Sequence, residues 1–247
     1  MEDFNRIRYF NMNRLERIAW LRQGNPRIAP SLLACDFVCL ESELQALDKG
    51  GAEVLHLDVM DGHFVPSLTY GPLIIKNIRD HSSLVLDAHL MISNPSQYLE
   101  EFIDAGCDIV TIHLESTPDP GPLMMELRKQ GIIAGLSIKP DTPVEMIFPW
   151  LDQCDLVLIM SVEPGFGGQT FQESALGKLR ILRKRGPEHL LLEVDGGIKR
   201  HNITMVAQTG CNLIVAGTAI FHASDYGEEI KHLSRLSQSP DIAQTSN

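Results

Sequence analysis

The chain has 247 residues, a length that suits one (β/α)8 barrel or two small domains, and 44% of them are apolar, enough for an ordinary globular core. A net charge of −11 argues against a general nucleic-acid binder, because such proteins present a basic surface to the phosphates. No apolar run approaches the ~20 residues that span a membrane, so no membrane partner is expected. The five cysteines include no Cys-x-x-Cys pair and are typical of reduced thiols in a cytoplasmic protein.

Residues 1–27 differ in charge from the rest of the chain. Six arginines and three acidic residues give this segment a net charge of +3, which leaves −14 for the remainder. The segment lacks a secretory apolar core and the serines of a transit peptide, so organelle targeting is the weaker interpretation. We predict a short N-terminal extension with one amphipathic helix near residues 12–22. This helix would pack on the outside of the main domain or at a subunit contact.

From residue 28 onward, a strand followed by a polar loop and a helix recurs eight times. The predicted strands are Ile28–Leu33, Val54–Val59, Leu84–Leu90, Ile109–His113, Ile132–Ile138, Leu156–Met160, Leu190–Val194 and Leu213–Ala216. The predicted helices are Cys39–Lys49, Pro72–Arg79, Pro95–Ala105, Leu123–Gln130, Val144–Leu151, Glu173–Arg185, His201–Gln208 and Tyr226–Leu236.

This strict alternation predicts a parallel sheet with right-handed crossovers, and eight such units close naturally into a barrel. A doubly wound open sheet is the alternative, but Pro30-Ser31 stands where a dinucleotide-binding fold has Gly-x-Gly-x-x-Gly. We therefore expect an α/β fold with a single catalytic (β/α)8 TIM barrel over residues 28–236. The polar segment 237–247 shows no periodicity and is expected to be a loose tail.

Polar side chains gather at the predicted carboxyl ends of the strands, where barrel enzymes hold their functional groups. His56 and Asp58 lie two residues apart and so point to the same face of the second strand. Burying both in an apolar strand has a desolvation cost that a bound cation would offset. Ser31, His89 and Asp195 lie at the ends of the first, third and seventh strands. The two imidazoles and two carboxylates suit Zn²⁺ or Fe²⁺, with Mn²⁺ and Co²⁺ as further candidates, better than Mg²⁺ or Ca²⁺.

Taken singly, several of these residues have a purely structural explanation. His89 could be an ordinary hydrogen-bonded histidine, and Asp61 and Asp195, each followed by glycine, could simply form turns. Only the convergence of four potential ligands at strand ends favours a metal site over these explanations.

Glycine-containing loops follow the last three predicted strands. They contain Gly165-Phe166-Gly167-Gly168, Gly196-Gly197 and Gly217-Thr218. Glycine lets backbone N–H groups approach an anion, and the loops after strands seven and eight are the usual phosphate site of this fold. A single glycine loop is more often a turn, but three at adjacent strand ends predict a phosphate-binding site.

A metal between two carboxylates, with a phosphate site nearby, suits proton abstraction next to a carbonyl group. Carboxylates from different strands could lie on opposite faces of the planar enediolate, so that one removes the proton and the other returns it with inversion. Two other functions stay open. A barrel lyase or decarboxylase would need a lysine, for which Lys139 is the only candidate, and a non-catalytic sugar-phosphate binder would not need both Asp58 and Asp195.

Five longer motifs resemble the ribulose-phosphate 3-epimerase family of pentose phosphate enzymes, whose fold is a (β/α)8 barrel. They are IAPSL at residues 28–32, HLDVMDGHFVP at 56–66, DAHLM at 87–91, VEPGFGGQ at 162–169 and EVDGGI at 193–198. The resemblance extends over about residues 28–230. It implies interconversion of D-ribulose 5-phosphate and D-xylulose 5-phosphate by two-base proton transfer at C3. The alternative is the same reaction on a six-carbon ketose phosphate such as D-allulose 6-phosphate.

The resemblance also implies roles for particular residues. One divalent metal would be bound by His56, Asp58, His89 and Asp195, with Asp58 and Asp195 as the acid/base pair. The substrate would contact Ser31, His89, Met60, Met91, Met160, Gly165, Phe166, Gly167, Gly168, Gly196, Gly197, Gly217 and Thr218. The expected assembly is a homo-oligomer, either a dimer or a hexamer.

Overall fold

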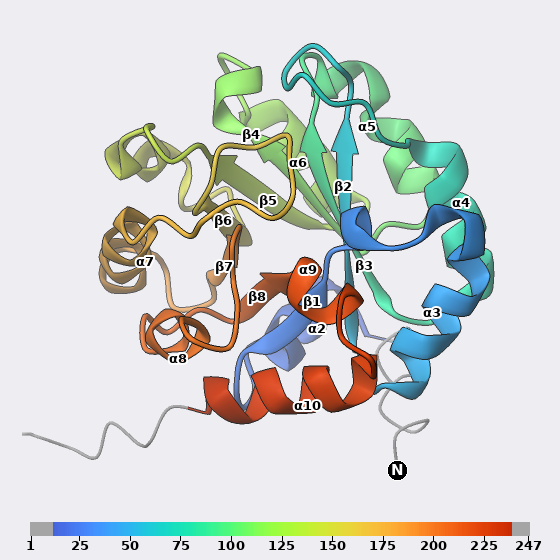
Figure 1. Ribbon diagram of the computed structural model, residues 1–247. Coiled ribbons are helices and arrows are strands. Elements are labelled where there is room, and N and C mark those ends of the chain that lie inside the picture. The colour runs from blue at the N-terminus through green and yellow to red at the C-terminus, as the bar shows by residue number, and fades with distance from the viewer. Residues whose placement is uncertain (1–11, 239–247) are drawn as a thin grey trace, which may run out of the picture.

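The computed structural model describes residues 12–238, so most of the predicted tail and the beginning of the N-terminal extension lie outside the described residues. Within this range, eight parallel strands form one sheet in the order β1-β8-β7-β6-β5-β4-β3-β2. The strands occupy the centre of the molecule and the helices surround them (Figure 1). The strands are β1 (Arg27–Pro30), β2 (Val54–Met60), β3 (Val85–Met91), β4 (Ile109–His113), β5 (Ile133–Ile138), β6 (Leu156–Met160), β7 (Leu191–Asp195) and β8 (Leu213–Ala216).

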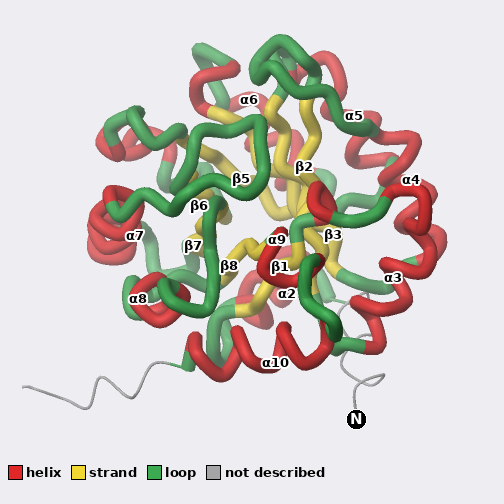
Figure 2. Tube along the Cα trace, viewed as in Figure 1, coloured by secondary structure: helices red, strands yellow, loops and turns green. Residues whose placement is uncertain are grey.

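The sheet closes into a barrel where β1 meets β2. Ser31, directly after β1, forms a parallel bridge with His56 of β2. The α-helices are α2 (Arg14–Leu21), α3 (Leu40–Lys49), α4 (Pro72–His81), α5 (Pro95–Asp104), α6 (Gly121–Lys129), α7 (Ser174–Arg185), α8 (Ile203–Ala207), α9 (Thr218–Phe221) and α10 (Tyr226–Ser237). Shorter 3₁₀ segments are η1 (Leu32–Ala34), η2 (Phe37–Cys39), η3 (Leu114–Ser116) and η4 (Val144–Trp150). The predicted (β/α)8 barrel is confirmed, and Figure 2 shows its strands ringed by helices.

Two predicted elements differ from the structure for local reasons. The first strand ends at Pro30 instead of Leu33, because the backbone carbonyls of Ser31 and Leu32 accept hydrogen bonds within the turn η1. The predicted helix Val144–Leu151 is the 3₁₀ segment η4, with bonds three residues apart such as Met146 N–H to Pro143 O. Pro149 lies inside this segment and lacks the N–H that an α-helix needs there. The short helix α9 was not predicted.

The inward side chains of the barrel form stacked layers, because residues two apart along a strand face the same side. The lowest layer is apolar and includes Val54 and Val85, which are paired in register. The next layers contain the pairs His56–Asp87 and Asp58–His89. The pair Met60–Met91 lies at the carboxyl end of the same two strands. Along β2 and β3 the inward-facing polar side chains therefore begin above the apolar layer and continue toward the carboxyl ends, where the predicted functional residues lie.

Helix α2 closes the amino-terminal end of the barrel. Asn13 and Glu16 form a capping box at its start, which satisfies the first backbone N–H groups. Ile18 and Leu21 are 2% and 1% exposed and pack with the lowest layer of the barrel. Arg14 forms an ion pair with the buried carboxylate of Asp155. The described part of the extension therefore contributes to the core of the barrel, whereas we expected it to pack on the outside of the main domain or at a subunit contact.

We predict that Ile18→Ala lowers the free energy of unfolding by about 2–4 kcal/mol, because the truncation leaves a cavity in a closely packed layer. Leu15, on the same helix, is 61% exposed and provides the matched control. Leu15→Ala should change stability by less than about 0.5 kcal/mol. Urea denaturation of the two variants measures the difference, and equal losses would contradict the role assigned to α2.

None of the helices within residues 12–238 combines the length and hydropathy that a membrane-spanning helix requires.

Candidate active site

The polar layers of the barrel place four predicted site residues side by side. His56 and Asp58 project inward from β2, and His89 projects inward from β3 next to Asp58. Asp195 ends β7 beside Met160 of β6. His56 and His89 are fully buried and Asp58 is 3% exposed. Side chains that are far apart in the sequence therefore meet at one point near the carboxyl end of the barrel.

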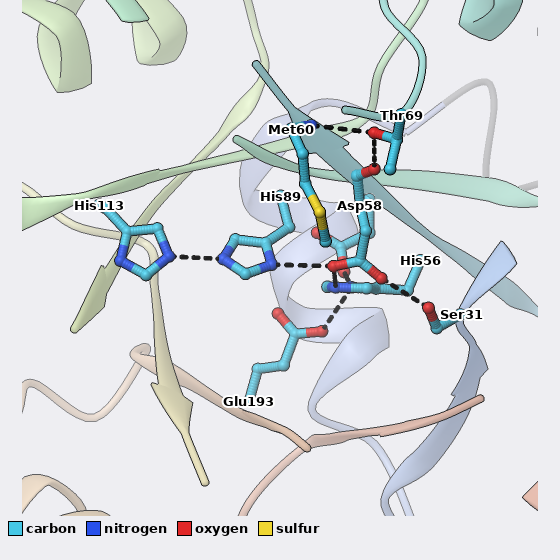
Figure 3. A network of polar contacts seen from close by, with 9 residues as sticks. Ser31, His56, Asp58, Met60, Thr69, His89, His113 and Glu193 are labelled. Atoms are coloured by element: carbon cyan, nitrogen blue, oxygen red, sulfur yellow. Dashed lines mark hydrogen bonds and ion pairs between the residues drawn. The ribbon is translucent and has the colours of Figure 1, made fainter. Parts of the chain in front are cut away.

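Asp58 lies between His56, His89 and Ser31 (Figure 3). Its Oδ1 lies 3.4 Å from Nε2 of His56 and 3.2 Å from Nδ1 of His89. Its Oδ2 accepts a hydrogen bond of 2.5 Å from the hydroxyl of Ser31. The backbone carbonyl of Asp58 accepts a further bond of 2.7 Å from the hydroxyl of Thr69. These contacts hold the carboxylate in one orientation.

The four residues form a group that could hold a metal ion. One potential ligand atom from each of His56, Asp58, His89 and Asp195 lies within 4.8 Å of the others. Nε2 of His56 is buried and has no hydrogen-bond partner among the described residues. A buried imidazole nitrogen without a partner, facing a carboxylate oxygen, suits a cation that accepts its lone pair. The donor set of two nitrogens and two oxygens fits a borderline divalent ion.

Two buried acids support His56 from below. Nδ1 of His56 lies 2.7 Å from Oδ2 of Asp87 and 3.4 Å from Oε1 of Glu193. A carboxylate only accepts hydrogen bonds, so Asp87 keeps the proton on Nδ1 and leaves the Nε2 lone pair directed at the site. Burial, followed by the charge of Asp87, raises the pKa of Glu193 well above its ordinary value. The sequence analysis missed both acids, although each lies two residues before a predicted ligand on the same strand face.

The two predicted acid/base carboxyl groups differ in their pKa values. Burial opposes ionisation of Asp58, but His56 and His89 outweigh it and lower the pKa of Asp58 below its ordinary value. Burial and the charge of Asp58 raise the pKa of Asp195 to about 6. Near neutral pH, Asp58 is therefore ionised while Asp195 can readily take up or release a proton.

A third histidine extends the group beyond the predicted residues. Nε2 of His113 lies 2.8 Å from Nε2 of His89, and Nδ1 of His113 lies 3.1 Å from Oε2 of Glu115. Burial lowers the pKa of His113 to about 4. The sequence analysis missed His113, although a polar residue at the carboxyl end of the fourth predicted strand was a signal for it.

A cavity of about 470 Å³ opens directly above these carboxylates. Two walls of the cavity are formed by the predicted methionines and by the predicted glycine loops. Its lining includes Ser31, Asp58, Met60, Met91, Met160, Gly165, Phe166, Gly167, Gly168, Asp195, Gly196, Gly197, Gly217 and Thr218. His56 and His89 are not among the described residues that line it, because both are fully buried, His56 one layer below Asp58 and His89 beside Asp58.

The glycine loops come closer together than any other residue would allow. At Gly197, with φ of +63°, an added Cβ would lie 2.5 Å from the backbone nitrogen of Phe171 and 2.7 Å from the carbonyl oxygen of Gln169. Gly168 also has a positive φ of +76°. The loops after β6 and β7 therefore expose backbone to the cavity with no side chain in between.

Asp61 has the structural role that its Asp-Gly sequence suggested. Its Oδ1 accepts hydrogen bonds of 2.8 Å from the backbone N–H groups of His63 and Phe64. Its Oδ2 accepts another of 2.8 Å from the N–H of Ser93. Asp61 therefore shapes the loop beside the cavity and is not among the described residues that line it.

Comparison with known proteins agrees with this geometry. The profile of the Ribulose-phosphate 3 epimerase family matches residues 27–221. A ribulose-phosphate 3-epimerase of Bacillus subtilis is 43% identical over 211 residues, which cover 84% of this chain and 97% of that protein. One of Schizosaccharomyces pombe is 43% identical over 210 residues, covering 84% and 92%. A cytoplasmic isoform of Oryza sativa subsp. japonica is 44% identical over 213 residues, covering 85% and 93%.

Solved structures of more distant proteins share the fold. A 3-hexulose-6-phosphate synthase superposes with a TM-score of 0.62 at 17% identity, covering 86% of this chain and 99% of that chain. A mutant tryptophan synthase α-subunit of Pyrococcus furiosus superposes with a TM-score of 0.63 at 19% identity, covering 87% and 97%. These low identities support only the shared barrel fold, whereas the family profile spans residues 27–221, which include all eight strands and the predicted site residues. The chain belongs to the ribulose-phosphate 3-epimerase family.

Proposed function

We infer that this protein is a ribulose-phosphate 3-epimerase, an isomerase that interconverts D-ribulose 5-phosphate and D-xylulose 5-phosphate in the pentose phosphate pathway. The observation that carries this inference is the pair of carboxyl groups of different pKa, Asp58 and Asp195, at the base of one cavity. The three relatives compared above are all named for ribulose phosphate, which favours the five-carbon substrate over D-allulose 6-phosphate.

His56, Asp58, His89 and Asp195 would together hold one divalent metal ion. Their close grouping and the unpartnered Nε2 of His56 support this assignment. The mixed nitrogen and oxygen donors favour Zn²⁺ or Fe²⁺, followed by Mn²⁺ or Co²⁺. When bound, such an ion supplies positive charge that stabilises the negative charge developing on the substrate oxygens.

Asp58 and Asp195 would transfer the proton at C3. One carboxylate takes the proton from C3, and the electron pair of the broken C–H bond enters the enediolate. The other carboxyl group delivers a proton to the opposite face, which inverts the carbon. Burial and the charge of Asp58 make proton uptake by Asp195 easier than for an exposed carboxylate, and the hydroxyl of Ser31 keeps Asp58 oriented. The two carboxyl groups exchange roles when the reaction runs in reverse.

The cavity walls would bind the remainder of the substrate. Met60, Met91 and Met160 provide an apolar surface beside the reacting carbon and exclude water from the enediolate. The backbone of Gly165 to Gly168, of Gly196 and Gly197, and of Gly217 and Thr218 would bind the phosphate. Ser31 and His89 complete the proposed site, with His89 beside Asp58.

We predict that Gly197→Ala raises KM roughly tenfold or more, since an alanine Cβ would displace the loop at residues 169–171 and weaken phosphate hydrogen bonds worth about 1.5–3 kcal/mol each. Gly131 has a similar φ of +80° with nothing within 4 Å of an added Cβ. Gly131→Ala therefore carries the same backbone strain without the displacement, and KM should be unchanged. Steady-state kinetics of both variants test this, and equal effects on KM would remove the loop from phosphate binding.

Deuterium labelling tests the reaction itself. The purified protein is incubated with D-ribulose 5-phosphate in deuterated water, and the product is examined by NMR. D-xylulose 5-phosphate carrying deuterium at C3 is expected, because the proton returned to the opposite face comes from a carboxyl group that exchanges with solvent. Unlabelled product, or no product, would refute the mechanism. A parallel incubation with D-allulose 6-phosphate should be much slower.

Self-association is the remaining part of the proposal. Exposed apolar side chains lie on the segments that follow β1 and β2, with Val38, Leu68 and Leu73 exposed by 94%, 77% and 74%. Such a group supports a homo-oligomer, a dimer or a hexamer, formed through this face. Sedimentation of the full chain distinguishes these assemblies from a monomer. The relative named as a cytoplasmic isoform supports a cytoplasmic location for this chain.

A further inference from the structure

His113 and His89 face each other inside the barrel with the same ring nitrogen. Their Nε2 atoms are 2.8 Å apart, and both rings are fully buried (Figure 3). Nδ1 of His89 points the other way, 3.2 Å from Oδ1 of Asp58. A hydrogen bond between two imidazole nitrogens requires that one carries a hydrogen and the other a lone pair. The direction of this bond therefore determines which nitrogen of His89 is left for the metal site.

Glu115 determines the direction of this hydrogen bond, because it contacts the nitrogen of His113 that does not face His89. Its Oε2 lies 3.1 Å from Nδ1 of His113, and an ionised carboxylate can only accept a hydrogen bond. Its Oε1 accepts a bond of 2.8 Å from the backbone N–H of Lys139 and another from the hydroxyl of Thr142. Burial opposes the charge, but hydrogen bonds from His113 and Thr142 outweigh it and lower the pKa of Glu115 to about 2. Nδ1 of His113 must therefore donate.

Glu115, His113 and His89 form a row of side chains, and the ring of Phe64 covers one side of His113. It packs against His113 with 4.8 Å between ring centroids, and the ammonium group of Lys139 lies 4.1 Å above the same phenyl ring. His113 and His89 are themselves 5.0 Å apart between centroids. With both imidazoles fully buried, the two Nε2 atoms have each other as partners. Glu115 thus fixes the proton of His113 from one end of the row. At the other end, Oδ1 of the ionised Asp58 also accepts from an N–H, so without a cation it favours a proton on Nδ1 of His89, and a cation bound to Asp58 removes that preference.

We propose that Glu115 and His113 form a relay that fixes His89 in the tautomer protonated on Nε2, so that the Nδ1 lone pair faces the metal. Both are positioning residues, and the inference rests on the metal site proposed above. With its proton on Nδ1, His113 accepts at Nε2, so Nε2 of His89 must donate and the lone pair of its Nδ1 is left for the metal. His56 is fixed more directly, since Asp87 contacts its Nδ1. The two proposed imidazole ligands thus present different nitrogens to the metal. His56 presents Nε2 because the carboxylate of Asp87 holds its Nδ1, and His89 presents Nδ1 because the imidazole of His113 holds its Nε2.

NMR of the wild-type chain tests the relay without any substitution. Long-range ¹H–¹⁵N correlation of histidine-labelled protein loaded with Zn²⁺ identifies the protonated nitrogen of each ring. His113 should be protonated on Nδ1 and His89 on Nε2. A His113 ring whose proton lies on Nε2, or a His89 ring whose proton lies on Nδ1, would overturn the proposal.

Glu115→Gln reverses the relay with almost no change in shape. The N–H of Lys139 and the hydroxyl of Thr142 donate to Oε1, so the amide oxygen takes that place and the NH₂ group faces His113. Nδ1 of His113 must then accept, its Nε2 carries the proton, and the proton of His89 moves to Nδ1. We expect the Zn²⁺ affinity, measured by chelator competition, to fall about 10–100-fold.

Thr142→Val is the matched control. It removes a hydrogen bond to the same carboxylate but leaves the charge facing His113. Its Zn²⁺ affinity should stay within about twofold of wild type, and circular dichroism should show both variants folded. A Glu115→Gln affinity within about twofold of wild type, or a His113 that keeps its proton on Nδ1 in that variant, would refute the relay.

These measurements use no sugar phosphate and are therefore separate from the proposed reaction. A wild-type chain that binds Zn²⁺ with the expected tautomers but fails the deuterium experiment would refute only the proposed reaction. A wild-type chain that binds no Zn²⁺ would refute the metal site and the relay together.

Discussion

Asp195→Asn is expected to lower kcat by at least about 10³-fold while the barrel stays folded, because positioned acid/base groups contribute about 10²–10⁴-fold and this one is also a proposed metal ligand. An amide can neither take up nor release the proton at C3. Proton transfer between Asp58 and C3 should continue in this variant at a reduced rate. In deuterated water, the variant should exchange the C3 hydrogen of one of the two epimers only. That epimer identifies the face on which Asp58 acts.

Glu163→Gln is the control for Asp195→Asn. Glu163 lines the same cavity but is not one of the four residues of the proposed metal group. The substitution makes the same change from carboxylate to amide and should alter kcat by less than about threefold, the ordinary range of context effects for a side chain without a role in the chemistry. Turnover of Asp195→Asn above a tenth of the wild-type value, measured at saturating metal, would remove Asp195 from the acid/base pair.

Removal of the metal should have the second largest effect. A chelated and dialysed sample is expected to lose about 10³-fold in kcat, because Lewis-acid stabilisation of several kcal/mol is withdrawn and each 1.4 kcal/mol is tenfold in rate. The buried Asp58, Asp195, His56 and His89 would stay in place, since His113, Asp87 and Ser31 hold three of them independently. Circular dichroism should therefore show an unchanged fold.

Restoring individual metals then identifies the ion that the site prefers. Zn²⁺ or Fe²⁺ should recover the highest activity and Mn²⁺ or Co²⁺ less, whereas Mg²⁺ and Ca²⁺ should recover little, because they favour all-oxygen ligands. Metal analysis of protein purified without a chelator shows which ion the chain carries. Full activity in stripped protein would contradict a metal requirement.

The barrel could be predicted because its signals are local. Alternation of apolar strands with helices, and glycines such as Gly106 and Gly131 at helix ends, depend only on residues near each other in the chain. The rule that functional side chains lie at the carboxyl ends of strands is also local, and it predicted His56, Asp58, His89 and Asp195 as site residues. The structure brings these four together. The helix predicted at Val144–Leu151 failed because one residue, Pro149, favoured a tighter turn.

The supporting residues could not be predicted in the same way. Asp87 and Glu193 lie within motifs quoted from the sequence, yet what they contact depends on the register between neighbouring strands. Glu115 follows β4 but has its carboxylate fixed by the backbone of Lys139 after β5. The amphipathic pattern of α2 predicted a helix from local sequence alone. Its position at the amino-terminal end of the barrel depends on the apolar layer that all eight strands form together.

The sequence by itself therefore determined the order of the elements, the closure expected of eight βα units, and the identity of the residues at the strand ends. Tertiary structure decided what those residues are able to do. The pKa of Asp195 rises to about 6 because folding buries it beside the charge of Asp58, which is far away in the chain. The nitrogen that His89 presents depends on His113 and Glu115 for the same reason. Charge, desolvation and tautomer are set by neighbours in space, and only the closed barrel brings those neighbours together.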